Sequence, residues 1–169
     1  MDVLVVDGYN IIGDWEDLKR LKDIDLEQAR NRLIEKMAEY KAFTGYRVII
    51  IFDAYYVPGI ANKINEYKVE IIYTKENETA DERIEKLVKS LKNVVNQVYV
   101  ATSDYAEQRT IFGRGALRKS ARELYIELVD MEAEIEKSIK QHEKANKHIK
   151  IPLTDDILEK FEKWRRGNE

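Results

Sequence analysis

The segment Val3-Leu4-Val5-Val6-Asp7-Gly8 decides the expected fold, because a short β-branched run that stops at Asp-Gly is typical of a buried strand entering a turn. A second such run, Val48 to Phe52, is followed by Asp53-Ala54. Between the two runs, apolar residues recur at spacings of three or four from Leu26 to Tyr40, which predicts a helix that ends near Gly45. Strand, helix and strand in this order predict a βαβ unit with two parallel strands.

Two further strands continue the pattern. The run from Val69 to Tyr73 predicts a third strand, and the run from Val98 to Ala101 predicts a fourth. Apolar residues at helical spacing from Ile84 to Leu91 predict the helix between them. Strands that alternate with helices predict an α/β fold with a central parallel sheet and helices on both faces. No strand is expected after about residue 104.

The C-terminal part of the chain is expected to be helical. Ser120 and Glu123 have the spacing of a capping box, and an apolar stripe continues from there through at least Ile139. Residues 150–153 should form a turn, after which Asp155-Asp156 begins a short final helix. We expect one domain over residues 1–150 and a C-terminal helix over residues 151–169 that belongs to the same unit. A mobile final helix is the alternative.

Charge and composition exclude several classes of protein. The net charge of -3 argues against a protein that binds nucleic acid through its overall charge, so any basic surface must be local. The absence of cysteine excludes disulfides and cysteine-bound zinc and suits a reducing compartment. The N-terminus lacks the features of a signal peptide, and the longest apolar run is far shorter than the roughly 20 residues of a membrane helix. We therefore expect a cytoplasmic protein that does not contact a membrane.

Four aspartates are expected to meet at one edge of the sheet. Asp7 and Asp53 end the first two strands, Asp104 follows the fourth, and Asp81 opens the helix after the third. In an open parallel sheet, ligands bind beyond the carboxyl ends of the strands. Carboxylates gathered there repel each other unless a cation lies among them, and Mg²⁺ or Mn²⁺ prefers such oxygen ligands. Asn10 is a candidate polar partner, and a metal-activated water would be the nucleophile.

Each aspartate also has a structural interpretation. Asp7-Gly8 is compatible with a simple turn, Asp81 with a favourable charge at a helix N-terminus, and Ser103-Asp104 with an N-cap. Asp53 is the least certain ligand, because it would also suit the orientation of a water or of another ligand. Four unrelated caps need not share one sheet edge, which favours a functional cluster. The two histidines, His142 and His148, lie in the polar part of the long helix, so a histidine-pair ribonuclease mechanism is not expected.

A basic segment follows Asp104 directly. From Tyr105 through Arg122 the only acidic residue is Glu107. A local excess of positive charge beside an acidic cluster predicts contacts to RNA phosphates, although a solvated helix face is the alternative. The candidate RNA-binding residues are Arg109, Arg114, Arg118, Lys119 and Arg122.

Three motifs carry a family resemblance. Asp7-Gly8-Tyr9-Asn10, Thr79-Ala80-Asp81-Glu82 and Thr102-Ser103-Asp104 resemble the NYN branch of the PIN-like nucleases, and the stretch from Gln108 through Leu124 is similar to its bacterial YacP group. The resemblance implies a PIN-like three-layer sandwich with a central parallel sheet, here with a long C-terminal helical extension. Many relatives carry a second Asp two residues after the one matching Asp104, whereas this chain has Ala106.

The resemblance also implies a function. It points to an endoribonuclease that uses Mg²⁺ or Mn²⁺, associates with the ribosome and cuts mRNA during translation. In this family pattern Asp7, Asp81 and Asp104 match the metal ligands, and Asn10 and Asp53 occupy supporting positions. A non-catalytic RNA-binding or ribosome-binding module is the alternative. A phosphatase of the haloacid dehalogenase type is disfavoured, because Tyr9 stands where such enzymes need a second Asp.

Overall fold

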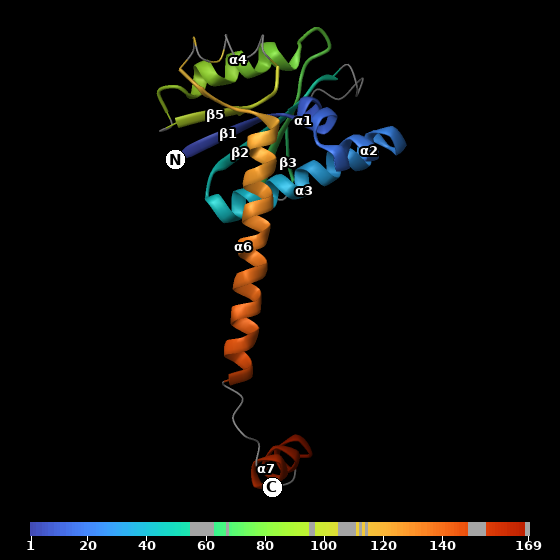
Figure 1. Cartoon of the computed structure of the whole chain (residues 1–169), viewed down its shortest axis with the longest axis vertical. Coiled ribbons are helices and arrows are strands. Elements are labelled where there is room, and N and C mark those ends of the chain that lie inside the picture. The colour runs from blue at the N-terminus through green and yellow to red at the C-terminus, as the bar shows by residue number, and fades with distance from the viewer. Residues whose placement is uncertain are drawn as a thin grey trace. The chain divides into compact units, whose positions relative to one another are not determined.

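The computed structural model describes residues 1–54, 63–66, 68–94, 97–104, 111, 113, 115–148 and 155–167. The chain divides into two compact units, Met1–Met131 and Glu132–Glu169. The first unit contains the sheet and the helices that cover it (Figure 1). The expected domain boundary after residue 150 stays a prediction.

The sheet has six strands in the order β3-β4-β2-β1-β5-β6. Five are parallel, namely β1 (Asp2–Asp7), β2 (Arg47–Phe52), β4 (Val69–Tyr73), β5 (Gln97–Ala101) and β6 (Leu117–Lys119), whereas β3 (Lys63–Glu66) runs antiparallel to β4. The expected central parallel sheet is therefore confirmed. β1 lies between β2 and β5, with Asp7 opposite Ile51 and Val6 opposite Ala101. This central position brings the loops after β2 and β5 to either side of Asp7.

Two strands, β3 and β6, were not predicted. The expectation that strands stop near residue 104 was wrong, because β6 pairs with β5 from Tyr99↔Leu117 to Ala101↔Lys119. β6 has only three residues, two of them charged, so it shows no apolar run. Backbone hydrogen bonds identify it instead, including the one that the N–H of Thr102 donates to the Lys119 carbonyl at 3.0 Å.

The helices follow local signals where these are strong. α3 (Leu26–Thr44) begins at Asp25, whose carboxylate accepts a hydrogen bond from the N–H of Glu27 at 3.0 Å. It ends at Gly45, whose φ of 75° is the left-handed conformation that glycine favours, as the sequence predicted. α4 (Ala80–Leu91) is capped by Thr79. The two helices before α3, α1 (Gly8–Asp14) and α2 (Glu16–Ile24), were not predicted.

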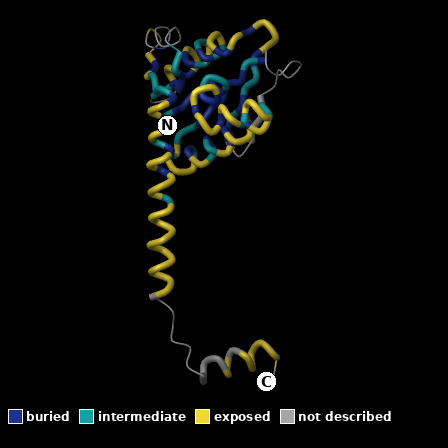
Figure 2. The backbone as a smooth tube through the Cα atoms, turned by 45° about the vertical axis from the view of Figure 1, so that its right-hand side comes forward, coloured by how far each residue is buried: buried dark blue, intermediate teal, exposed yellow. Residues whose placement is uncertain are grey.

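The core consists of two apolar layers on either face of the sheet. Alternate strand residues, such as Val5, Ile51 and Val100, pack with Ile84 and Val88 of α4. In β1 and β2 the residues between them, such as Leu4, Val6 and Ile50, are also fully buried and point to the other face, where α1 and α3 lie (Figures 1 and 2). Burial on both faces explains why these strands appear in the sequence as uninterrupted apolar runs. The arrangement is the expected three-layer sandwich.

The long helix α6 (Ala121–His148) crosses from the first unit into the second. Its first turn is capped by Ser120, whose hydroxyl accepts the N–H of Glu123 at 3.0 Å, as the capping-box spacing predicted. The buried stripe of α6 ends at Met131, and Ile139, which we expected to be covered, is 53% exposed.

The rest of the second unit is a separate short helix. α7 (Asp155–Arg165) confirms the final helix predicted from the acidic pair. The expected turn over residues 150–153 lies outside the described residues. In the part of the chain that the structure describes, the helices are too short or too polar to cross a bilayer.

Candidate functional site

Asp7 occupies the centre of the candidate site. It is the last residue of β1 and immediately precedes α1, and it is 8% exposed. The turn from strand to helix depends on Gly8, because a Cβ at that residue would lie 2.4 Å from Cε1 of Phe52. The absence of a side chain at Gly8 therefore lets α1 start directly above the buried Phe52 ring, with Asp7 held at the sheet edge.

Asn10 connects this turn to the loop that carries Asp104. Its Oδ1 accepts the backbone N–H of Ser103 at 2.9 Å, across 93 sequence positions. The N–H of Asp104 donates to Thr102 Oγ1 at 3.1 Å, and Thr102 is fully buried. The supporting role expected of Asn10 has a concrete geometric basis, since its amide joins the first turn of α1 to the end of β5. Thr102 and Ser103, which the sequence analysis named as part of a motif but not as site residues, complete this connection.

Asp81 lies in the first turn of α4, and this helix begins at the same edge of the sheet. Its neighbour Ala80 is buried against the cluster that includes Val5 and Ile51, whereas Asp81 itself is exposed. The hydroxyl of Thr79 accepts the N–H of Glu82 at 3.2 Å and so caps the first turn of α4, which carries Asp81.

Glu78, which was not predicted as a site residue, stabilises the loop before Asp81 through two ion pairs. The Glu78 carboxylate is 7% exposed and accepts Nε of Arg83 at 2.8 Å and Nζ of Lys86 at 2.9 Å. Burial alone would raise the pKa of Glu78, but the hydrogen bond from Lys86 and the charge of Arg83 outweigh it and hold the pKa below its ordinary value. The spacing of Glu78, Arg83 and Lys86 is a signal in the sequence, but one shared with many surface ion pairs.

Asp53 belongs to a different part of the edge. It follows β2 directly and is half-buried. Burial raises the pKa of Tyr9, and the charge of Asp53 makes a smaller contribution in the same direction. The Tyr9 hydroxyl also accepts Nη1 of Arg30 at 3.2 Å. Asp53 is therefore associated with the Tyr9 side of the site.

The donor chemistry of this edge suits a hard divalent cation, because carboxylate and amide oxygens are the available ligands. The side chains do not form a finished ligand set, however. Within the described ranges, no three His, Cys, Asp or Glu side chains are close enough together to hold one ion. The order of strands and helices thus brings Asp7, Asp81 and Asp104 to one edge of the sheet.

The predicted basic residues have different surroundings. Arg109 and Arg114 lie outside the described residues. Arg118 is half-buried and its Nε donates to the carbonyl of Thr102 at 3.3 Å, so it lies beside the loop of Asp104. Arg122 is exposed in the first turn of α6.

Lys119 differs from the surface cation that we expected. Its ammonium binds both carboxylate oxygens of Glu127, at 2.7 and 2.9 Å, and lies 5.0 Å from the centre of the Tyr99 ring. The Lys119 side chain is only 12% exposed. The hydroxyl of Tyr40 donates to the same carboxylate at 3.0 Å. These contacts hold the Lys119 ammonium between β6, α3 and α6, and its contact to RNA stays a prediction.

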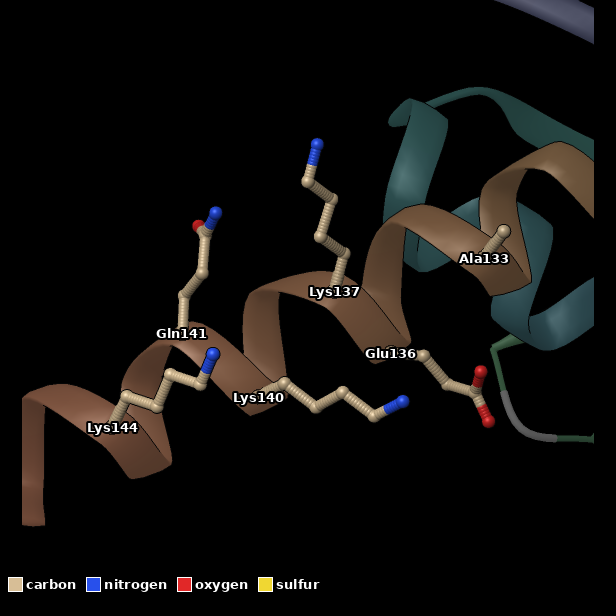
Figure 3. Close-up of a pocket in the computed structure, with 6 residues that line it drawn as sticks. All are labelled: Ala133, Glu136, Lys137, Lys140, Gln141 and Lys144. Atoms are coloured by element: carbon tan, nitrogen blue, oxygen red, sulfur yellow. The ribbon is translucent and has the colours of Figure 1, made fainter.

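A surface hollow occurs in the second unit and contains none of the aspartates (Figure 3). Residues of α6 alone line it: Ala133, Glu136, Lys137, Lys140, Gln141 and Lys144. A hollow bounded by one face of one helix cannot enclose a substrate.

Comparison with known proteins assigns the family. A family model described as the YacP-like NYN domain matches residues 4–166. The chain belongs to this YacP-like NYN family. It is 55% identical to the uncharacterized protein YacP of Bacillus subtilis (strain 168) over 168 residues, which cover 99% of each chain.

Solved structures of YacP-like NYN proteins agree with this assignment. The crystal structure of Rae1 (YacP) from Bacillus subtilis matches with a TM-score of 0.76 at 55% identity, over 99% of this chain and 97% of that one. Its W164L mutant matches with a TM-score of 0.77 at 52% identity, over the same shares of the two chains. NYN domains form a nuclease family, so membership supports a nuclease activity on RNA. The resemblance noted in the sequence is thus confirmed at the level of family and fold.

Proposed function

We propose that this chain is a divalent-metal-dependent endoribonuclease that hydrolyses phosphodiester bonds of mRNA, in association with the translating ribosome. The observation that carries the proposal is the arrival of Asp7, Asp81 and Asp104 at one edge of the sheet, in a chain of a nuclease family. Asp7 is fixed by the central strand, and the loop of Asp104 is tied to it through Asn10.

The proposed division of roles follows from how each residue is held. Asp7, Asp81 and Asp104 would hold Mg²⁺ or Mn²⁺, which when bound supplies Lewis-acid chemistry for the attacking water and the phosphate. Asn10 links the loop of Asp104 to α1, because its Oδ1 accepts the N–H of Ser103. Asp53 would orient water or substrate from the Tyr9 side of the edge. Arg118 and Arg122 would bind RNA phosphates beside the same loop, and we keep Arg109 and Arg114 as further proposed RNA contacts.

The alternative function is a non-catalytic RNA-binding or ribosome-binding module. The two functions differ in what the aspartates do, because a binding module has no need of their charges. Ribosome association agrees with the chain's local basic residues and its net charge of -3, which disfavours indiscriminate binding to RNA.

Replacement of the aspartates tests the proposal. Asp7→Asn and Asp81→Asn should each leave a folded protein that no longer cleaves mRNA on translating ribosomes, as measured by mapping RNA ends. Asp130→Asn, at an exposed position of α6, is the matched control and should cleave normally. Cleavage by the unchanged protein should stop in EDTA and leave 5′-phosphate ends. Equal cleavage in EDTA and in magnesium, or 2′,3′-cyclic phosphate ends, would contradict the metal mechanism.

A further inference from the structure

Arg30 is a half-buried cation whose partner is a phenol. It lies in the second turn of α3, and its Nη1 donates to the Tyr9 hydroxyl at 3.2 Å. Within the described part of the chain, the Arg30 guanidinium has no carboxylate partner. The similarly buried Arg47, by comparison, binds Glu70 through two hydrogen bonds.

Among the described residues, no carboxylate therefore lies within ion-pair distance of the Arg30 guanidinium, although the charge of Asp53 acts on the same Tyr9 hydroxyl. Burial raises the pKa of Tyr9, so the phenol stays neutral and supplies an oxygen but no negative charge. A guanidinium has five N–H donors in a planar fork, and one of them is used here. A partly desolvated guanidinium with unused donors is suited to bind a carboxylate or a phosphate from another molecule.

One tyrosine ring, Tyr9, contacts this cation, and a second, Tyr73, packs against the same phenylalanine as Tyr9. Tyr9 comes from the first turn of α1 and Tyr73 from the end of β4, and both are half-buried. Each packs against the buried ring of Phe52, Tyr9 at a centroid distance of 5.0 Å and Tyr73 at 5.7 Å. Phe52 thus fixes two partly exposed aromatic rings at the same sheet edge as Asp7 and Asp53.

We propose that Arg30, Tyr9 and Tyr73 form a nucleotide-binding subsite for single-stranded RNA. Arg30 binds a backbone phosphate, and the Tyr73 ring stacks on the base of a neighbouring nucleotide, while Tyr9 orients Arg30. Bases of single strands are free to stack on aromatic side chains, whereas those of an RNA duplex stack on each other. The inference rests on the proposed function and adds to it the form of the substrate and the side of Asp7 on which it is bound.

Binding of a short fluorescein-labelled single-stranded RNA, measured by anisotropy over a series of salt concentrations, tests the phosphate contact. The measurements use the full chain with Asp7→Asn, which separates binding from cleavage. Arg30→Gln should weaken binding and reduce the slope of log K against log salt by about 0.7, the value for one phosphate of a single strand. Arg30→Lys should keep the slope, because it keeps the charge. Arg32→Gln is the matched control, because Arg32 is exposed on the same helix and paired with Glu35.

Tyr73 variants test the stacking contact separately. Tyr73→Leu should weaken binding about tenfold without changing the salt slope, and Tyr73→Phe should retain most of the affinity because it keeps the ring. Fluorescence of the buried Trp15 checks that each variant is folded. Three results would each overturn the subsite. They are no detectable RNA binding by the Asp7→Asn chain itself, an unchanged affinity and salt slope after Arg30→Gln, and an unchanged affinity after Tyr73→Leu.

Cleavage assays on chains with Asp7 intact distinguish this inference from the proposed function. Cleavage by the unchanged chain together with normal RNA binding by Arg30→Gln would overturn the subsite and leave the nuclease standing. Loss of binding in Arg30→Gln, in a chain that cleaves no RNA, would support the subsite and contradict the nuclease.

Discussion

Substitution of Gly8 by Ala tests whether the turn after β1 depends on the Phe52 ring. A Cβ at residue 8 would lie 2.4 Å from Cε1 and 2.5 Å from Cδ1 of Phe52, and 3.0 Å from the carbonyl oxygen of Ile51. Favourable contacts between carbon atoms begin near about 3.5 Å, so the ring would have to retreat by about 1 Å. Phe52 is fully buried and flanked by Tyr9 and Tyr73, so it has no free space into which to move. The new methyl group must therefore displace the turn that carries Asp7.

We expect Gly8→Ala to lower the free energy of unfolding by about 3 kcal/mol, the upper part of the range for overpacked cores. In a chain of 169 residues this corresponds to a fall in Tm of about 6–12 °C. Tryptophan fluorescence during thermal unfolding measures the change, because Trp15 is 3% exposed and reports on the core, whereas Trp164 is already 81% exposed.

Gly13→Ala provides the matched control for this measurement. Gly13 belongs to the same helix, and a Cβ there meets nothing within 4 Å. Alanine is the better helix former, so this variant should gain up to about 1 kcal/mol. A Gly8→Ala protein as stable as the Gly13→Ala protein, with RNA cleavage unchanged, would refute the steric account of the turn.

Three further predictions concern the polar contacts around the site. Asn10→Ala leaves the N–H of Ser103 without its acceptor and should lower the unfolding free energy by about 1 kcal/mol in urea titrations, with a larger relative loss of RNA cleavage. The pKa of Glu78 is lowered in the folded state, so its contribution to stability is present above the unfolded pKa of about 4.3 and is lost as the pH falls through the folded value. The difference in unfolding free energy between the unchanged chain and Glu78→Gln should therefore shrink below about pH 4, and a constant difference would contradict the ion-pair account. Lys119→Met should cost about 1–2 kcal/mol of stability through the loss of Glu127 as a partner, yet leave RNA affinity unchanged in a binding titration; a specific loss of RNA affinity would restore the contact expected from the sequence.

The centre of the fold was predictable because its strands are buried on both faces. β1 and β2 consist of apolar residues without polar alternation, which marks a central parallel strand even in a single sequence. α3 was predictable at both ends, since Asp25 and Gly45 are local signals that act within one turn of the helix.

The elements that were missed are stabilised by contacts distant in sequence. β6 depends on pairing with β5, and its charged residues give no strand signal by themselves. α1 follows Asp7 without any side-chain cap, in a position that the sequence favours for a turn. Its formation depends on the space above Phe52, which no local pattern reveals.

The location of the site was predictable, but the residues that hold it were only partly so. The aspartates follow from a general property of parallel sheets, in which loops after neighbouring strands share an edge. Asn10 was found as a polar neighbour, whereas its partner Ser103 is 93 residues away and has no periodic relation to it. The pairing of Arg30 with Tyr9 is equally invisible in the sequence, because it depends on the packing of α3 against the start of α1. Lys119 shows what a charge pattern cannot reveal, since this residue of a basic segment is largely buried and ion-paired with Glu127, whose own side chain is 42% exposed.

Three different kinds of interaction hold the three proposed ligands in place, so acid and salt should affect their positions differently. Asp7 depends on steric packing between Gly8 and Phe52, and Asp104 on a neutral hydrogen bond between Asn10 and Ser103. Asp81 follows a loop held by the ionic contacts of Glu78. Salt and acid weaken ion pairs but have little effect on packing or on neutral amide hydrogen bonds. A pH below about 4 and high salt should therefore loosen the loop before Asp81 first, while the turns that carry Asp7 and Asp104 keep their positions.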